Sequence, residues 1–271
     1  MICFPNAKIN LGLNIISKRS DGYHNIETVF YPINLCDALE IVPAKDKDGI
    51  FQQTGISVDG DPQNNLVMKA YRMLQQIVEL PEIDIYLRKN IPFGAGLGGG
   101  SSDAAFMLKL LNDFANLNIL DDQLEKMAAQ IGADCSFFIR NRSVFAEGIG
   151  NLFTPVELSL KGYYLVLVKP DIHVSTKDAY ANIKPELPAE SITNIIQCPI
   201  NAWKDRLIND FEKSVFIQYP AIGEIKRKLY DNGALYASMS GSGSSVFGIF
   251  EEETDLKDLF PDSLVCCIGL F

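Results

Sequence analysis

The sequence predicts a globular protein of mixed strands and helices, arranged as one large domain or two medium lobes. Residues 8–16 alternate polar and apolar side chains, as a half-buried strand does. Apolar residues recur at helical spacing after Asn65, and asparagine is a preferred helix N-cap. A glycine-rich stretch, residues 94–100, joins a strand-like segment to a helix-like one. The length of 271 residues allows either domain organisation.

The elements of the first half follow from the same two periodicities. Strands are expected at residues 8–16, 27–31, 38–42, 83–89 and 143–147, with a turn at residues 20–22. Helices are expected from Leu66 to Ile77, at residues 101–114, and at residues 121–131 with Asp121 as the cap. An apolar, strand-like run follows Gly132-Ala133-Asp134.

The second half begins after Gly148-Ile149-Gly150, where the character of the sequence changes. Strands are expected at residues 163–169, 234–239, 245–250 and 264–268, and helices at residues 211–218 and 221–230. Prolines 185, 188 and 199 mark irregular connections between them. We therefore predict a boundary between an N-terminal lobe, residues 1–155, and a C-terminal lobe, residues 156–271.

The composition excludes several classes of partner. A formal net charge of -10, from 24 basic and 34 acidic residues, repels nucleic acid and anionic membranes. The sequence shows neither a long apolar run nor the charged and apolar segments of a signal peptide. The six cysteines form no C-x-x-C pair, so we expect free thiols in a reducing compartment. We predict a cytoplasmic protein.

The glycine-rich stretch is the most informative part of the chain. Five glycines fall within the seven positions 94–100, which is more than a flexible turn needs. Glycine lets backbone N–H groups turn inward, and the following helix offers free N–H groups and the positive end of its dipole. Ser101 and Ser102 add hydroxyl groups in the first turn. The pattern predicts a cradle for a chain of phosphates.

Common phosphate-binding motifs fit this stretch poorly. Gly94-x-Gly96-x-x-Gly99 matches a dinucleotide fingerprint, but residues 90–93 separate it from the strand and a second helix follows the first. The lysine of a Walker A motif does not follow, and the catalytic motifs of protein kinases do not occur in the sequence.

The stretch does resemble the phosphate-binding motif of the GHMP kinases, through Pro92-x-x-x-Gly96-Leu97-Gly98-x-x-Ser101-Ser102. Residues 5–11 and 239–245 resemble the other two motifs of this family, in the same order. The resemblance implies a two-lobed α+β kinase with its active site in the cleft between the lobes. It also implies ATP and Mg²⁺ as cofactors, with the protein ligands of the metal unknown.

The resemblance assigns the chemistry to Lys8 and Asp134. Asp134 takes the role of general base, and Lys8 beside it keeps that carboxylate ionised and can hold the substrate hydroxyl or a γ-phosphate oxygen. Taken singly, Lys8 would be an exposed strand charge and Asp134 a polar residue at a helix end. Asn10 shares a strand face with Lys8 and is implied to orient the substrate, although an edge-strand polar group is an equal alternative.

The resemblance also implies the residues that bind ATP. The phosphates would lie on the glycine-rich loop and the adenine near the start of the first helix, where a cap and a core contact explain the two residues equally well. The residues assigned to ATP are Pro92, Gly94, Gly96, Leu97, Gly98, Gly99, Gly100, Ser101, Ser102, Asn65 and Leu66.

The substrate is implied by residues 19–24, which resemble one branch of the family. That branch phosphorylates the 2-hydroxyl of a cytidine diphosphate-linked polyol in a route to isoprenoid precursors. Tyr23 would stack on cytosine and His24 would bind its polar edge, with Tyr180 as a second stacking residue and Thr176 on the substrate side. Ser240 and Gly241 would border the substrate and the phosphates.

Two alternatives remain open at this stage. A homoserine or mevalonate type of GHMP kinase would share the phosphate loop but lack the cytosine site. A non-catalytic nucleotide sensor would keep the loop without the chemistry, and the presence of both Lys8 and Asp134 argues against it.

Overall fold

The computed structural model describes residues 1–45, 49–57, 61, 64–181 and 183–270. The chain divides into a first unit, Met1–Ala7, Leu35–Phe93 and Gly98–Arg142, and a second unit, Lys8–Asn34, Gly94–Leu97 and Ser143–Phe271. The glycine-rich stretch is therefore shared, because its first part belongs to the second unit and its remainder to the first. The predicted boundary near residue 155 stays a prediction.

The first unit contains a sheet in the order β1-β4-β6-β5. Its strands are β1 (Ile2–Cys3), β4 (Ala38–Pro43), β5 (Phe51–Gly55) and β6 (Ile83–Lys89). Strand β6 pairs antiparallel with β4 and parallel with β5. Ile83, Ile85 and Leu87 are buried, in keeping with the alternation seen in the sequence.

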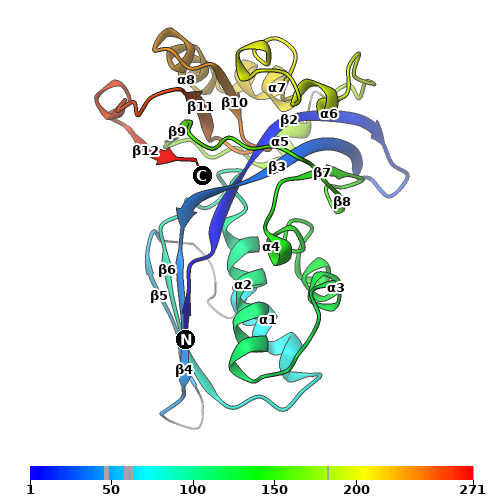
Figure 1. The fold of residues 1–271 in the computed structure, drawn as a ribbon, viewed down its shortest axis with the longest axis vertical. Helices are drawn as coiled ribbons and strands as arrows, with labels where there is room; N and C mark the ends of the chain where they lie inside the picture. Colours follow the sequence, from blue (N-terminus) through cyan, green and yellow to red (C-terminus); the bar gives the residue numbers. More distant parts are fainter. Residues whose placement is uncertain (46–48, 58–60, 62–63, 182, 271) are drawn as a thin grey trace. The chain divides into compact units, whose positions relative to one another are not determined.

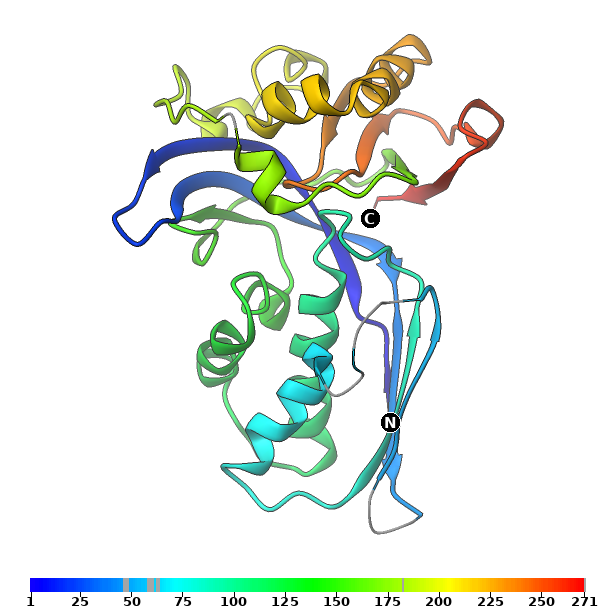
Figure 2. The same ribbon diagram turned by 180° about the vertical axis from the view of Figure 1, so that it is seen from behind.

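Helices lie on one face of this sheet, as Figure 1 shows and Figure 2 confirms from behind. They are α1 (Leu66–Gln75), α2 (Gly99–Phe114), α3 (Asp121–Ile131) and α4 (Phe137–Arg140). The Asn65 side chain caps α1 by accepting a hydrogen bond from the N–H of Val67, so the predicted cap is confirmed. The helix ends at Gln75, and Ile77, expected on its apolar face, is exposed beyond it.

Two further expectations for the first unit were wrong. The apolar run after Asp134 folds as helix α4 rather than as a strand. Asp121 is the first residue of α3 and does not cap it; the side chain of Gln123 accepts a hydrogen bond from the N–H of Leu120 instead. A short apolar run fits either a strand or a buried helix, and α4 packs against α2 and α3.

The second unit contains a sheet in the order β2-β3-β7-β8. Its strands are β2 (Asn6–Lys18), β3 (His24–Cys36), β7 (Val144–Glu147) and β8 (Leu152–Pro155). The turn predicted at residues 20–22 joins β2 to β3, and Gly22 there has a φ of +89°. Strand β2 is longer than its predicted range and almost fully buried up to Ile15.

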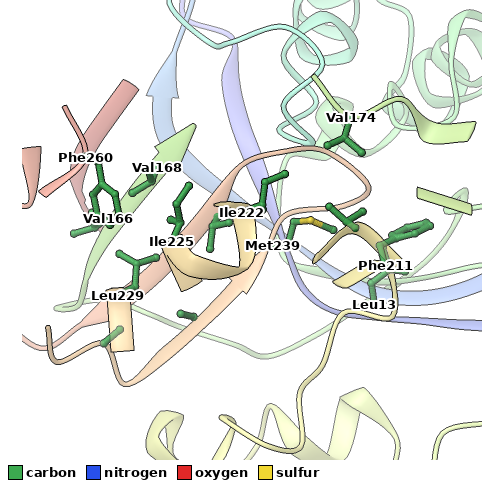
Figure 3. Packing of buried hydrophobic residues seen from close by; sticks show 14 of the residues in the cluster. Leu13, Val166, Val168, Val174, Phe211, Ile222, Ile225, Leu229, Met239 and Phe260 are labelled. Carbon is green, nitrogen blue, oxygen red and sulfur yellow. The ribbon is translucent and has the colours of Figure 1, made fainter. Parts of the chain in front are cut away.

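A second sheet in this unit has the order β10-β11-β9-β12, with antiparallel neighbours. Its strands are β9 (Tyr164–Pro170), β10 (Tyr236–Met239), β11 (Val246–Phe250) and β12 (Ser263–Gly269). Helices α7 (Phe211–Gln218) and α8 (Pro220–Asp231) cover one face of it (Figure 1). Figure 3 shows the core between α8 and the sheet, where Ile222 and Leu229 face Val166 and Met239.

Shorter elements connect the main ones, among them α5 (Thr176–Tyr180) and α6 (Ile192–Ile195). None of the helices in the described part of the chain is both long and apolar enough to cross a membrane. The six cysteines are all free, as predicted, but Cys135 alone of the six is fully buried and the others are half-buried.

Candidate active site

The glycine-rich loop owes its conformation to glycines with positive φ. Gly96 has a φ of +77°, and a Cβ atom there would collide with the carbonyl oxygen of Ser240 in the second unit. Gly98, with a φ of +71°, is the N-cap of α2 in the first unit. Any other residue would be strained at either position, so both glycines have a structural reason as well as the predicted functional one.

The start of α2 fits a phosphate chain. The first turn of a helix leaves N–H groups without partners inside the helix, and they point to where an anion can bind. A Cβ on Gly100 would meet only Leu66, at 3.7 Å, so no neighbour crowds the helix backbone there. The buried hydroxyl of Ser102 has no hydrogen-bond partner among the residues that the structure describes. These features are compatible with ATP phosphates and a metal ion they carry.

Asp134 lies in the turn between α3 and α4, in the same unit as the start of α2. The residue after it, Cys135, has a buried thiol that interacts with the side chain of Ser101 in the first turn of α2. The turn that carries the predicted base therefore lies beside the predicted phosphate cradle. The predicted pairing of Asp134 with Lys8, a residue of the second unit, stays a prediction.

Lys8 is buried, with 3% of its surface exposed, so its interpretation as an exposed strand charge is wrong. Its ammonium group donates to Asn10 Oδ1 at 2.6 Å and to the carbonyl oxygen of Gly96 at 3.0 Å. Asn10 Nδ2 in turn donates to Thr28 Oγ1 at 3.0 Å. The shared strand face predicted for Lys8 and Asn10 is confirmed by this contact.

The turn after β10 joins the same network within the second unit. Ser240 Oγ donates to the carbonyl oxygen of Gly96 at 2.8 Å and accepts from the backbone N–H of Asn10 at 3.3 Å. Gly241 has a φ of +56°, and a Cβ there would lie 3.3 Å from Asn10 Oδ1. The structure thus brings together Lys8, Asn10, Gly96 and Ser240, which lie far apart in the sequence.

Two of the residues predicted to bind a base, His24 and Tyr180, meet at the start of β3. The rings of His24 and Tyr180 are stacked, with centroids 4.6 Å apart and planes inclined by 21°. Tyr180 also packs edge-on against Phe211. Tyr23 is 62% exposed, and Thr176, the first residue of α5, is exposed as well. Burial and the charge of Lys18 lower the pKa of His24, which keeps its imidazole neutral at pH 7.

Asn65 and Leu66 have well-defined structural roles in the first unit. Besides capping α1, Asn65 donates from Nδ2 to Gln53 Oε1 at 3.1 Å. Leu66 lies against the surface of α2 at Gly100. Pro92 precedes the loop and is half-buried. In the described part of the chain, no group of three or more His, Cys, Asp or Glu side chains is placed to hold a metal ion.

Sequence reasoning missed a buried triad beside the start of α2. The ammonium of Lys89, at the end of β6, contacts the carboxylates of Asp37 and Asp103. Lys89 is the last residue of the strand predicted at residues 83–89, and only 4% of it is exposed. Asp37 Oδ1 also accepts from the backbone N–H groups of Asn90, at 2.5 Å, and Ile91, at 2.8 Å. The sequence signal was an acidic residue, Asp103, on the otherwise apolar face of a predicted helix.

The comparisons with known proteins agree with the motifs. The GHMP kinase N-terminal domain matches residues 65–142, and the GHMP kinase C-terminal family matches residues 199–260. The chain is 60% identical over 98% of both chains to a 4-diphosphocytidyl-2-C-methyl-D-erythritol kinase of Bacteroides fragilis. It is 62% identical over 97% of both chains to one of Parabacteroides distasonis.

Solved structures extend this similarity to the fold. A crystal structure of 4-(cytidine 5'-diphospho)-2C-methyl-D-erythritol kinase is 28% identical, with a TM-score of 0.84 over 99% of both chains. The mevalonate kinase of Methanococcus jannaschii has the same fold at 16% identity, with a TM-score of 0.75 over 100% of this chain and 98% of that one. The chain belongs to the 4-diphosphocytidyl-2-C-methyl-D-erythritol kinase family, within the GHMP kinases.

Proposed function

We propose that this chain transfers the γ-phosphoryl group of ATP to the 2-hydroxyl of 4-diphosphocytidyl-2-C-methyl-D-erythritol, in the non-mevalonate route to isoprenoid precursors. The names of relatives at 60–62% identity support this substrate over mevalonate or homoserine, since the solved mevalonate and homoserine kinases lie between 15% and 18% identity. The observation that carries the proposal is the stack of His24 on Tyr180. A flat aromatic surface beside a neutral imidazole suits a nucleobase, which mevalonate and homoserine lack.

The proposed chemistry begins with the carboxylate of Asp134, which accepts the proton of the substrate hydroxyl. The hydroxyl oxygen then forms a bond to the γ-phosphorus while the bond from that phosphorus to the β,γ-bridging oxygen breaks, which releases ADP. Lys8 stabilises negative charge on the transferred group, and Asn10 holds the Lys8 ammonium in place through its Oδ1. The N–H groups at the start of α2 hold the phosphates.

Bound magnesium would neutralise phosphate charge and help to align the γ-phosphoryl group. The residues that we assign to hold it, together with the phosphates, are Ser101 and Ser102. Ser102 fits this role because its buried hydroxyl lacks a partner among the described residues.

The test of the substrate is ADP release from Mg-ATP with a set of alcohols. The set contains 4-diphosphocytidyl-2-C-methyl-D-erythritol, free methylerythritol, mevalonate and homoserine. We expect turnover with the cytidyl substrate alone. Turnover with mevalonate or homoserine would retain the kinase chemistry and remove the base-binding role of His24 and Tyr180.

The test of the base is Asp134→Asn. An amide cannot accept the hydroxyl proton, so kcat should fall by about a hundredfold to ten-thousandfold. ATP binding should persist, because the cradle formed by α2 is unchanged, and nucleotide titration by calorimetry measures it. Near-native kcat in the folded variant would remove Asp134 from the base role.

A further inference from the structure

Asn209 is a buried residue that the motif analysis did not single out. It lies two residues before the start of α7, and 2% of it is exposed. Its Nδ2 group donates to two carbonyl oxygens, Met239 O at 2.8 Å and Gly241 O at 2.9 Å. Its Oδ1 accepts from the backbone N–H of Phe211 at 3.0 Å. One side chain therefore bonds the carbonyl groups on both sides of Ser240.

The segment that Asn209 holds is also closed by backbone hydrogen bonds, because Ser240 N–H donates to Ser245 O at 2.9 Å and Gly243 N–H donates to Ser240 O at 3.3 Å. Strands β10 and β11 pair from Tyr236 to Met239, and the turn begins after that last pair. Asn209 is itself anchored to β2, because Leu13 donates to Ile208 O at 2.8 Å and accepts from the N–H of Asp210 at 2.8 Å. The amide of Asn209 thus fixes the start of the turn against a buried strand.

Ser240 connects Asn209 to the Gly96 carbonyl group and the Lys8 ammonium group. Its hydroxyl donates to the Gly96 carbonyl oxygen, which also accepts from the ammonium of Lys8. A shift of the turn would move Ser240 Oγ and remove one of the two side-chain hydrogen bonds that orient the Gly96 carbonyl group. The orientation of Lys8 therefore depends in part on Asn209 through three links in series. Asn209 bonds the carbonyl groups beside Ser240, Ser240 bonds the Gly96 carbonyl, and Lys8 bonds that same carbonyl.

The chemistry of the site suits asparagine better than its close relatives. Two converging carbonyl oxygens need two donors from one group, and the N–H of Phe211 needs an acceptor. An amide supplies both, whereas a carboxylate has no donor and would face two carbonyl oxygens in a buried place. The position therefore requires a side chain with two donors and one acceptor, and not only one of the right size.

We propose that Asn209 is a positioning residue for phosphoryl transfer, which acts through Ser240 on the Gly96 carbonyl group and the Lys8 ammonium group. Asn209 itself touches no substrate in this proposal, which rests on the kinase function proposed above. Its loss should lower kcat and change the KM values little. The phosphate cradle at the start of α2 is formed by other residues, and Asn209 is connected to the His24–Tyr180 stack only through its bond to the backbone N–H of Phe211, which packs against Tyr180.

The test is steady-state ADP release from the full chain, for Asn209→Ala, Ser240→Ala and the double variant. We expect each single substitution to lower kcat by about ten- to a hundredfold, with both KM values within about threefold of wild type. If Asn209 acts through Ser240, the double variant should be no slower than the slower single variant. Multiplication of the two effects would overturn the proposal, as would kcat within twofold of wild type in folded Asn209→Ala.

Two further variants separate positioning from a loss of folding. Asp210→Asn is the matched control, because Asp210 lies next in the chain and bonds the N–H of Ile15 at 2.8 Å, away from the turn. Its kcat should stay within about twofold of wild type, and an equal loss in both variants would overturn the proposal. Asn209→Ser keeps one donor and should recover part of the lost kcat; if Asn209→Ala does not fold, kcat in Asn209→Ser equal to wild type overturns the proposal. A wild-type chain without turnover on any alcohol would instead refute the proposed function.

Discussion

The two parts of the glycine-rich loop are supported by different kinds of contact. In the second unit, the Gly96 carbonyl oxygen is bonded by one hydroxyl and one ammonium group, those of Ser240 and Lys8. In the first unit, the start of α2 lies beside Lys89, because a Cβ on Gly99 would be 3.4 Å from its Nζ. Lys89 is held between two buried carboxylates. The first support is a chain of hydrogen bonds, and the second is a triad of charges.

The two kinds of contact should affect different properties of the protein, namely the orientation of catalytic groups and the stability of the fold. Hydrogen bonds to a carbonyl oxygen orient single atoms and each contributes about 1 kcal/mol to stability, so their loss changes function more than folding. A buried ion pair is costly to leave incomplete, because removal of one partner leaves an uncompensated charge. We therefore expect the network around Gly96 to govern turnover and the triad around Lys89 to govern folding.

The largest effects should come from the same substitution at the two buried lysines. Lys8→Met should lower kcat by about a hundredfold to a thousandfold, since it removes a cation from the transferred phosphoryl group. Lys89→Met should lower the free energy of unfolding by about 3–5 kcal/mol, because the buried Asp37 carboxylate would lose its cation. Urea unfolding and kcat are measured on both variants. If Lys89→Met proved as stable as wild type but as slow as Lys8→Met, the division between the two supports would be wrong.

A smaller effect is expected from the same substitution at two glycines of the loop. Gly96→Ala should lower the free energy of unfolding by about 2–4 kcal/mol, because its Cβ meets the Ser240 carbonyl group and its φ is positive. Gly100→Ala is the matched control for stability, since its position is helical and its nearest neighbour would be 3.7 Å away. It should be stabilised by about 0.5–1 kcal/mol, as alanine is in helices. Equal stabilities of Gly96→Ala and Gly100→Ala in thermal or urea unfolding would show that the Ser240 carbonyl group moves aside for the added methyl group.

Local signals explain what could be predicted from the sequence. The Asn65 cap, the alternation in β6 and the glycine-rich loop depend on residues close to one another in the chain. Strand β5 was missed because its sequence, Phe51–Gly55, lacks alternation and pairs in parallel with a strand about thirty residues later. The relation of Lys89 to Asp37 spans 52 residues and could not be seen in any short window.

The candidate site also combines features that local sequence predicts with contacts that only the fold creates. The motifs named Lys8, Asn10 and Ser240, but their mutual bonds depend on how the strands of the second unit are ordered. Asn209 carried one local signal, since asparagine is common just before helices, and its Oδ1 does bond the N–H of Phe211. Its two bonds to the turn after β10 join positions 30 and 32 residues away. Only the folded chain relates that asparagine to the loop.

The pH dependence of stability tests the charge of the triad. Burial is the largest influence on the pKa of Asp103 and raises it to about 7, against the attraction of Lys89 and with the repulsion of Asp37. Cys3 also faces Asp103, but burial raises the pKa of its thiol to about 12, so it stays protonated. Between about pH 4 and pH 7 the native chain thus holds a proton that the unfolded chain has released, and stability falls as the pH rises through this window.

Asp103→Asn removes the titrating proton while keeping the shape of the side chain. The free energy of unfolding of this variant, relative to wild type, should therefore increase from pH 5 to pH 8, by up to about 1.4 kcal/mol per pH unit below pH 7. Urea unfolding at both pH values measures the difference. Ser240→Ala, which removes a neutral hydroxyl, should shift stability equally at both. Parallel pH profiles for wild type and Asp103→Asn would mean that Asp103 is ionised throughout, and that the triad responds to pH no more than the network around Gly96 does.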